Sequence, residues 1–146
     1  MIRIGKTRVG NGRTMKTIFT NGVFDIIHVG HIRLFTWAKS LGDRLVVGLN
    51  SDKSTRRLKG EGRPINNEHD RIFVLNSIKY IDDILVFDED TPYELIKRVK
   101  PYMIVKGSDY KYEDVVGRDL AEVYLVPHSG HSTTELLKIM KGEEYV

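Results

Sequence analysis

Short apolar runs alternate along the chain with stretches in which apolar residues recur at helical spacing. The run at residues 45–49 is apolar throughout. It lacks the alternation of apolar and polar residues that is typical of a strand with one solvent-exposed face. Such runs are typical of strands buried on both faces of a parallel sheet. The pattern predicts five strands, at residues 17–20, 44–49, 84–87, 102–106 and 122–126.

The segments between the predicted strands have helical features. Apolar residues recur at helical spacing over residues 29–40 and 67–80, and Pro92 marks the first turn of a helix over residues 92–99. A last helix is expected to begin near Ser132, at a capping-box pattern. The alternation predicts an α/β protein: a single Rossmann-like, doubly wound domain with a five-stranded, mainly parallel sheet.

Composition narrows the class of protein. The chain has 146 residues, 40% hydrophobic and 29% charged, which fits one soluble globular domain. No apolar run approaches the roughly 18 residues of a membrane span, and no signal-peptide pattern opens the chain. We therefore expect a cytoplasmic protein without a membrane partner. The absence of cysteine excludes a disulfide framework, a thiol nucleophile and thiolate zinc sites.

The basic character of the chain is concentrated in residues 1–16. Five basic residues and no acid lie there, and the remainder has 18 basic and 20 acidic residues. We predict a flexible basic extension over residues 1–16, with Met15 as an alternative start, and a folded domain over residues 17–146. This distribution argues against nucleic-acid binding by the folded part. For the extension itself, the alternative to a solvated tail is a basic arm that binds nucleic acid.

The segment that follows the first predicted strand has the features of a phosphate site. Gly22 and Gly30 permit close backbone approach, and a helix N-terminus offers free amide donors to an anion. His28 and His31 lie on one side of the helix start, and each can donate an N–H to a phosphate oxygen. The alternative is a pair of capping or surface histidines. The segment does not match the dinucleotide-binding glycine fingerprint.

These residues resemble the HxGH nucleotidyltransferases, in particular the small cytidylyltransferase-like branch. The likeness runs from about residue 17 to residue 140 and is closest to the adenylyltransferase domain of ADP-heptose synthesis. Glycerol-3-phosphate cytidylyltransferases and archaeal FAD synthetases are more distant. The segments that carry it are Thr20-Asn21-Gly22-Val23-Phe24-Asp25, His28-Val29-Gly30-His31, Asn50-Ser51-Asp52, Arg57-Leu58-Lys59-Gly60, Asn67-Glu68-His69-Asp70-Arg71, Lys106-Gly107-Ser108-Asp109-Tyr110 and Gly130-His131-Ser132-Thr133-Thr134.

The resemblance implies transfer of the nucleotidyl group of ATP or CTP to a sugar phosphate or polyol phosphate. Pyrophosphate is released and a nucleotide-activated sugar is made. The attacking phosphate is already an anion, so alignment and charge neutralisation matter more than a strong base. Mg²⁺ is the implied cofactor, held through the triphosphate rather than by a protein cage. A homodimer through residues 79–84 is also implied, and the choice between ATP and CTP stays open.

The resemblance also implies the site residues. Lys59, with Arg57, is expected to act from a mobile loop, and Arg71 to point along the sheet toward the strand ends. Asp25 is expected either to fix the first loop or to touch metal. The implied catalytic residues are His28, His31, Lys59 and Arg71; the implied nucleotide-binding residues are Thr20, Asn21, Gly22, Val23, Phe24, Asp25, Gly30, Arg57, Lys106, Gly107, Asp109, Gly130, Ser132 and Thr133.

Two other hypotheses remain open at this stage. The pairs His28 with His31 and His128 with His131 could ligate zinc in a hydrolase or a metal-binding module. A nucleotide-binding regulator without catalysis is the other, but such a protein would not need cations to stabilise a leaving group. A bound-metal assay separates the zinc hypothesis from the transferase.

Overall fold

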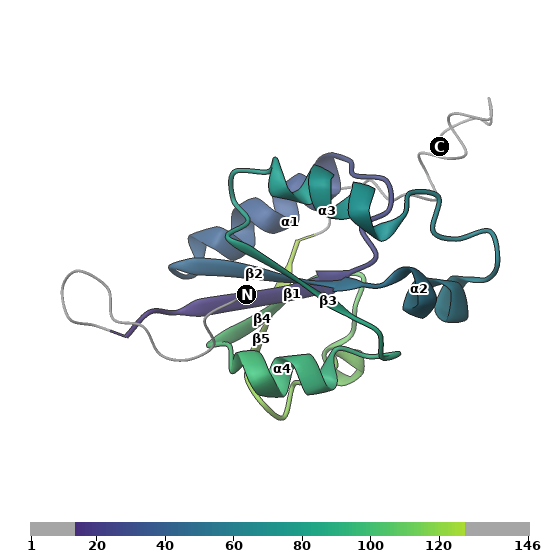
Figure 1. Cartoon of the computed structure of the whole chain (residues 1–146). Helices are drawn as coiled ribbons and strands as arrows, with labels where there is room; N and C mark the ends of the chain where they lie inside the picture. Colours follow the sequence, from purple (N-terminus) through teal and green to yellow (C-terminus); the bar gives the residue numbers. More distant parts are fainter. Residues whose placement is uncertain (1–13, 128–146) are drawn as a thin grey trace.

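The computed structural model describes residues 14–127, which contain five strands, four α-helices and one short 3-10 turn (Figure 1). The elements are β1 (Thr17–Gly22), α1 (Val29–Ser40), β2 (Arg44–Asn50), α2 (Asp52–Lys59), α3 (Glu68–Asn76), β3 (Asp83–Phe87), α4 (Tyr93–Val99), β4 (Met103–Gly107), η1 (Tyr112–Asp114) and β5 (Glu122–Val126).

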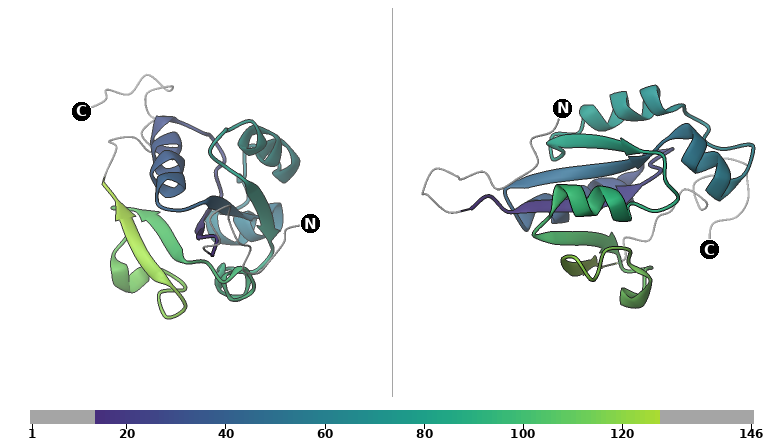
Figure 2. Two further views of the ribbon diagram at one scale, coloured as in Figure 1. Left: turned by 90° about the vertical axis from the view of Figure 1, so that its left-hand side faces the viewer. Right: turned by 60° about the horizontal axis from the view of Figure 1, so that its bottom comes forward.

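All five strands pair in parallel, in the order β3-β2-β1-β4-β5. Helices α1 and α3 lie on one face of the sheet and α4 on the other, which confirms the doubly wound prediction (Figures 1 and 2). The strand order reverses between β1 and β4. Ligands of such sheets bind at this switch point, beyond the carboxyl ends of the strands.

The continuously apolar strand over residues 44–50 supplies side chains to both faces. Leu45 and Val47 join the core beneath α1, whereas Val46 joins the core beneath α4, and all three are fully buried. Successive side chains of a strand point to opposite faces, so an unbroken apolar run is what two covered faces require.

Two predicted elements differ in the structure. Helix α3 ends at Asn76 instead of continuing to residue 80, and Ser77 caps its last turn. The basic segment expected as a loop forms α2, whose N-terminus is capped by Ser51 accepting from the Ser54 amide at 3.1 Å. Helix α2 buries Ser54 and Thr55 rather than large apolar side chains, so hydrophobic periodicity did not reveal it.

Several predictions concern residues that the structure does not describe. These are the extension up to residue 13, the last helix beginning near Ser132, and the segment that contains Gly130 and Thr133. Within residues 14–127, no helix is both long enough and apolar enough to cross a membrane.

Candidate active site

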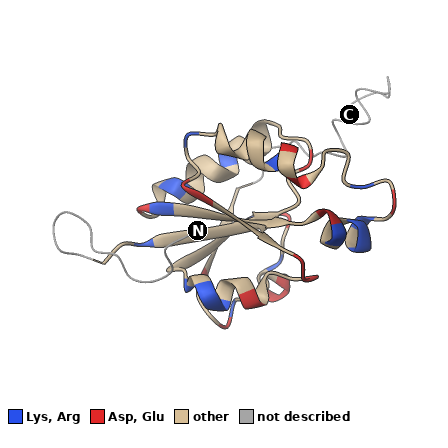
Figure 3. Ribbon diagram, in the orientation of Figure 1, with Lys and Arg blue, Asp and Glu red and all other residues tan. Residues whose placement is uncertain are grey.

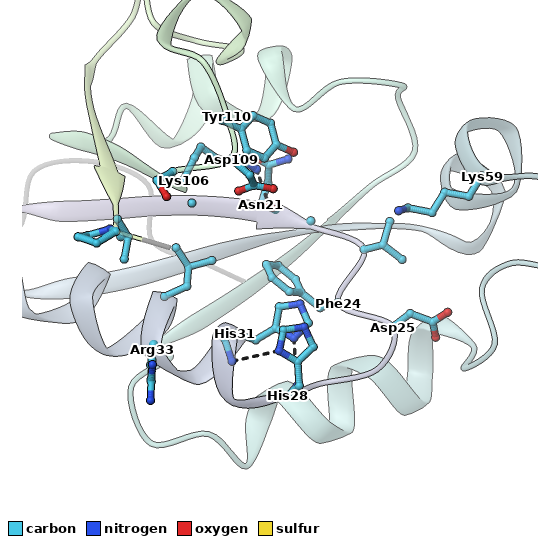
Figure 4. Close-up of a pocket in the computed structure, with 18 of the residues that line it drawn as sticks. Asn21, Phe24, Asp25, His28, His31, Arg33, Lys59, Lys106, Asp109 and Tyr110 are labelled. Atoms are coloured by element: carbon cyan, nitrogen blue, oxygen red, sulfur yellow. Dashed lines mark hydrogen bonds between the residues drawn. The ribbon is translucent and has the colours of Figure 1, made fainter. Parts of the chain in front are cut away.

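A cavity of about 360 Å³ opens at the carboxyl ends of β1 and β4, beside the start of α1 (Figure 4). It lies where the strand order reverses, as the fold predicts. Most of the predicted site residues that the structure describes line it. They are Asn21, Gly22, Val23, Phe24, Asp25, His28, Gly30, His31, Lys59, Lys106, Gly107 and Asp109.

The two histidines cap the helix that follows the first strand. Nδ1 of His28 accepts from the Gly30 amide at 3.0 Å, and Nδ1 of His31 accepts from the His28 amide at 3.1 Å. A neutral imidazole whose Nδ1 is an acceptor carries its proton on Nε2. The capping alternative is therefore confirmed, and it is compatible with the functional one, because capping fixes the tautomer that can donate Nε2–H to a phosphate.

His31 is neutral at physiological pH. Burial and the neighbouring His28 lower its pKa to about 4. The rings of the two histidines lie 3.9 Å apart, and Phe24 meets His31 edge-on at 5.5 Å (Figure 4). Phe24 has a left-handed φ of 48°, and a side chain at Gly22 would meet its ring at 3.0 Å. The glycine thus makes room for the aromatic ring that holds His31 in place.

Lys106 joins β4 to β1 across the switch point. Its ammonium donates to the Asn21 carbonyl at 2.9 Å and lies 4.4 Å from the centre of the Tyr110 ring. Burial lowers its pKa to about 8, although Asp109 opposes this shift. The side chain stays largely charged at neutral pH. It is therefore a fixed cation in the wall of the cavity.

Asp25 fixes a second loop against the first. Its two carboxylate oxygens accept from the Ile65 amide at 2.7 Å and the Asn66 amide at 2.8 Å, and Arg63 approaches at 3.3 Å. Burial alone would raise the pKa of Asp25, but these donors outweigh it and hold the pKa below its ordinary value. Of its two expected roles, loop fixation is the one these contacts support.

Arg71 reaches the ends of β1 and β2, as expected, but it does not line the cavity, which corrects its implied place among the catalytic residues. It is 1% exposed, and its guanidinium donates to the carbonyls of Val23 and Asn50 at 2.9 and 2.8 Å. It also donates to the Asn66 carbonyl at 3.0 Å and to Asp52 at 2.8 Å. Arg71 is a positioning residue that ties together the loops after β1 and β2, because a guanidinium offers five donors in a fixed plane.

Two further predicted residues lie away from the cavity lining. Thr20 is fully buried inside β1, and Arg57 pairs with Asp90 at 2.9 Å and with the Asp88 carbonyl. Lys59 lies at the end of α2, not in a loop, and reaches toward the cavity (Figure 4). Basic residues concentrate on α2 beside the site (Figure 3). Gly130, Ser132 and Thr133 lie outside the described residues.

The cavity also has lining residues outside the implied catalytic and nucleotide-binding sets, among them Arg33, Arg63 and Tyr110. Arg33 comes two positions after His31, and its basic charge beside the histidine pair is the signal that could have found it. Tyr110 belongs to the segment that carried the family resemblance. Arg63 approaches Asp25 at 3.3 Å and so takes part in fixing the loop after β1.

The described part of the chain contains no group of three or more His, Asp or Glu side chains that could hold a metal ion. His28 and His31 both use Nδ1 as an acceptor for amides, and His128 and His131 lie outside the described residues. The imidazole N–H groups of His28 and His31 and the side chains of Lys59 and Lys106 meet at this strand-end crevice. Such donors and cations, at this place in the fold, suit a ligand that carries several phosphates, such as a nucleoside triphosphate.

The cytidylyltransferase-like family model matches residues 19–139, and the chain belongs to this family. The bifunctional protein HldE of Aliarcobacter butzleri is 51% identical over 131 residues, or 88% of this chain and 28% of that protein. HldE of Nitratiruptor sp. is 52% identical over 89% of this chain and 29% of that protein. The chain thus spans less than a third of the length of these curated relatives.

Solved structures agree with this assignment. A lipopolysaccharide core biosynthesis protein from Thermoplasma volcanium is 31% identical and superposes with a TM-score of 0.66. That likeness covers 81% of this chain and 99% of the other. The pantoate-beta-alanine ligase of Francisella tularensis is 17% identical, with a TM-score of 0.58, and shares the fold.

Proposed function

We propose that this chain joins the nucleotidyl group of ATP or CTP to the phosphate of a sugar phosphate, releasing pyrophosphate. The observation that carries the proposal is the strand-end crevice, where His28, His31, Lys59 and Lys106 surround one cavity. The resemblance to the adenylyltransferase domain of ADP-heptose synthesis, and the HldE relatives, favour a heptose phosphate as acceptor and ATP as donor.

In the proposed reaction, an oxygen of the acceptor phosphate forms a bond to the α-phosphorus of the triphosphate. The bond from the α-phosphorus to the bridging oxygen breaks, and pyrophosphate leaves with the electron pair. The Nε2–H groups of His28 and His31 donate to triphosphate oxygens, while Lys59 and Lys106 offset the charge that develops on the leaving group. Donors fixed before the reaction contribute most, because they need no reorganisation in the transition state.

Mg²⁺ is the proposed cofactor, and the donor set fits an ion that enters with the triphosphate. Mg²⁺ bound to nucleotides uses one or two carboxylates, the phosphates and water. Asp109 lines the cavity and is the carboxylate suited to this role, since the oxygens of Asp25 accept from amides. The ion would neutralise charge on the phosphate oxygens.

The proposed assembly is a homodimer through residues 79–84, and the proposed compartment is the cytoplasm, where nucleoside triphosphates are available. The resemblance supports the dimer, and light scattering of the purified chain measures it. A monomeric mass at all concentrations would contradict this part of the proposal.

The test is pyrophosphate release with Mg²⁺. ATP and CTP are supplied separately against heptose, pentose and glycerol phosphates, and the His31→Gln variant is assayed beside the wild type. Gln at the third helix position keeps an acceptor for the capping amide but lacks the imidazole Nε2–H. We expect release with one donor and one acceptor, and a large loss in the variant. No release with any pair from folded protein would contradict the proposal.

A further inference from the structure

Lys106 is a buried cation whose direct partners are neutral. Of the lysines in residues 14–127, it alone is buried. Its ammonium donates to the backbone carbonyl of Asn21 at 2.9 Å and to the side-chain oxygen of Asn21 at 3.3 Å. The described residues give it no ion pair, and its third contact is the face of the Tyr110 ring, whose centre lies 4.4 Å away. A buried charge that has lost its water needs such contacts.

A turn after β4 brings the Tyr110 ring back over Lys106. The Tyr110 amide donates to the Gly107 carbonyl at 3.1 Å, which closes the turn over residues 107–110. A side chain at Gly107 would meet the Asp109 carboxylate at 2.7 Å, so the turn favours glycine at this position. Tyr110 is 43% exposed, yet this turn fixes its backbone in the cavity wall beside the lysine (Figure 4).

The contact with the ring leaves the ammonium able to bind an anion. An ammonium has three N–H donors, and Asn21 accepts two of them. An aromatic face attracts a cation through its quadrupole and uses no particular N–H. One donor thus remains for an oxygen of a ligand in the cavity that Lys106 lines. A carboxylate in place of the ring would neutralise the lysine and weaken its attraction for a phosphate.

We propose that Tyr110 is a positioning residue that holds the Lys106 ammonium, through the face of its ring, where it can bind the triphosphate. The inference rests on the proposed function and adds to it a residue that acts on the phosphates only through Lys106. A lysine side chain has many rotamers, and the ring restricts them before the ligand arrives. Donors that are already in place need no reorganisation when charge develops.

The test uses inorganic tripolyphosphate, which has the phosphates of a nucleotide but no base, and ATP beside it. Tyr110→Leu removes the ring and keeps an apolar side chain, whereas Tyr110→Phe removes only the hydroxyl. Calorimetry at neutral pH with Mg²⁺ should show about threefold to tenfold weaker binding of tripolyphosphate by Tyr110→Leu. Tyr110→Phe should bind as the wild type does. Tyr112→Leu should also be unchanged, because Tyr112 is exposed and is not part of the cavity wall.

A double-mutant cycle tests whether the ring acts through the lysine. Lys106→Met keeps a long unbranched side chain and removes the charge. In this background, Tyr110→Leu should cause no further loss of tripolyphosphate binding. NMR of the ligand-free protein gives a second readout, since the ring current of Tyr110 should shift the ε-methylene protons of Lys106 upfield. The shift should persist in Tyr110→Phe and disappear in Tyr110→Leu.

Several outcomes would overturn the proposal. They are no binding of tripolyphosphate to the wild type, equal binding by the wild type and Tyr110→Leu, and an equal loss in Tyr110→Phe. A loss that persists in the Lys106→Met background, or a loss for ATP alone, would mean that Tyr110 contacts the ligand itself. That result would also overturn the proposal. The proposed function fails separately, when wild-type protein releases no pyrophosphate with any substrate pair.

Discussion

Beside the cavity of about 360 Å³ lies a second one of about 270 Å³, which shares Lys59, Lys106 and Tyr110 with it. The two cavities are built in different ways. Around the first, Asp25 accepts from two backbone amides, His28 and His31 cap α1, and Arg71 donates to three carbonyls. Around the second, Asp90 and Asp114 are exposed side chains of connecting segments. Side chains fixed by buried hydrogen bonds suit a site whose donors must be placed in advance, whereas exposed loop side chains can vary without disturbing the fold.

The largest expected effect comes from replacing Arg71, whose buried hydrogen bonds hold the loops around the first cavity together. We expect Arg71→Met to lower the free energy of unfolding by about 3–5 kcal/mol, because three carbonyls and Asp52 lose a buried partner. Urea denaturation measures the loss, and exposed Arg98→Met on α4 is the control. A loss below about 1 kcal/mol, typical of a surface pair, would mean that Arg71 does not hold these loops.

A second prediction separates capping by the histidines from catalysis. His28→Asn keeps a side-chain acceptor at the N-cap, where Asn is among the best residues, but removes the imidazole Nε2–H. We expect kcat to fall about 10²–10³-fold, the effect of losing one fixed transition-state donor.

The thermal unfolding of His28→Asn should stay close to that of the wild type, whereas His28→Ala should lose both activity and stability. Steady-state assays and thermal melts of the two variants give the comparison. Normal activity in His28→Asn would mean that His28 acts only as the N-cap of α1.

The strands of the sheet could be predicted from the sequence because each one shows as an apolar run over a few consecutive residues. Runs buried on both faces and glycines after the first strand identify β1, β2 and the phosphate loop without knowledge of distant contacts. His31 was named because it lies at the start of the helix that follows the first strand, whereas Lys106 was named only through the family resemblance.

The misses come from long-range contacts. Arg71 is positioned by the carbonyls of Val23, 48 residues away in the sequence, and Asn50, 21 residues away. No rule based on residue spacing predicts contacts over such separations. Helix α2 was missed because Ser54 and Thr55 fill its buried side, one bonded to the Glu89 carbonyl and the other to the Ser51 carbonyl. Polar residues can form a buried helix face when hydrogen bonds satisfy them.

A third prediction tests whether the carboxylate of Asp25 holds the loop after β1 against the loop that contains Ile65 and Asn66. Asp25→Asn replaces one acceptor oxygen by an amide donor that faces a backbone N–H. We expect the free energy of unfolding at pH 7 to fall by about 1–3 kcal/mol, the cost of an unsatisfied buried group. Exposed Glu61→Gln in the neighbouring loop is the control.

The low pKa of Asp25 also fixes the sign of its pH dependence. Its contribution to stability is present above the ordinary carboxyl pKa and is lost as pH falls through the lower folded value. Acid titrations followed by circular dichroism should therefore show a smaller loss of stability in Asp25→Asn than in the wild type. Equal loss in both would assign the acid sensitivity to other groups.

The smallest expected effect concerns Lys106, which lines both cavities. The pKa of Lys106 is about 8, so the charged fraction in the free protein falls as pH rises through that value. We expect triphosphate affinity to fall by up to about tenfold from pH 7 to pH 9. His31, with a pKa of about 4, stays neutral over this range and does not contribute. Lys106→Arg keeps its charge, so calorimetry on that variant should show a flat profile, and a wild-type profile equally flat would exclude Lys106 as the titrating group.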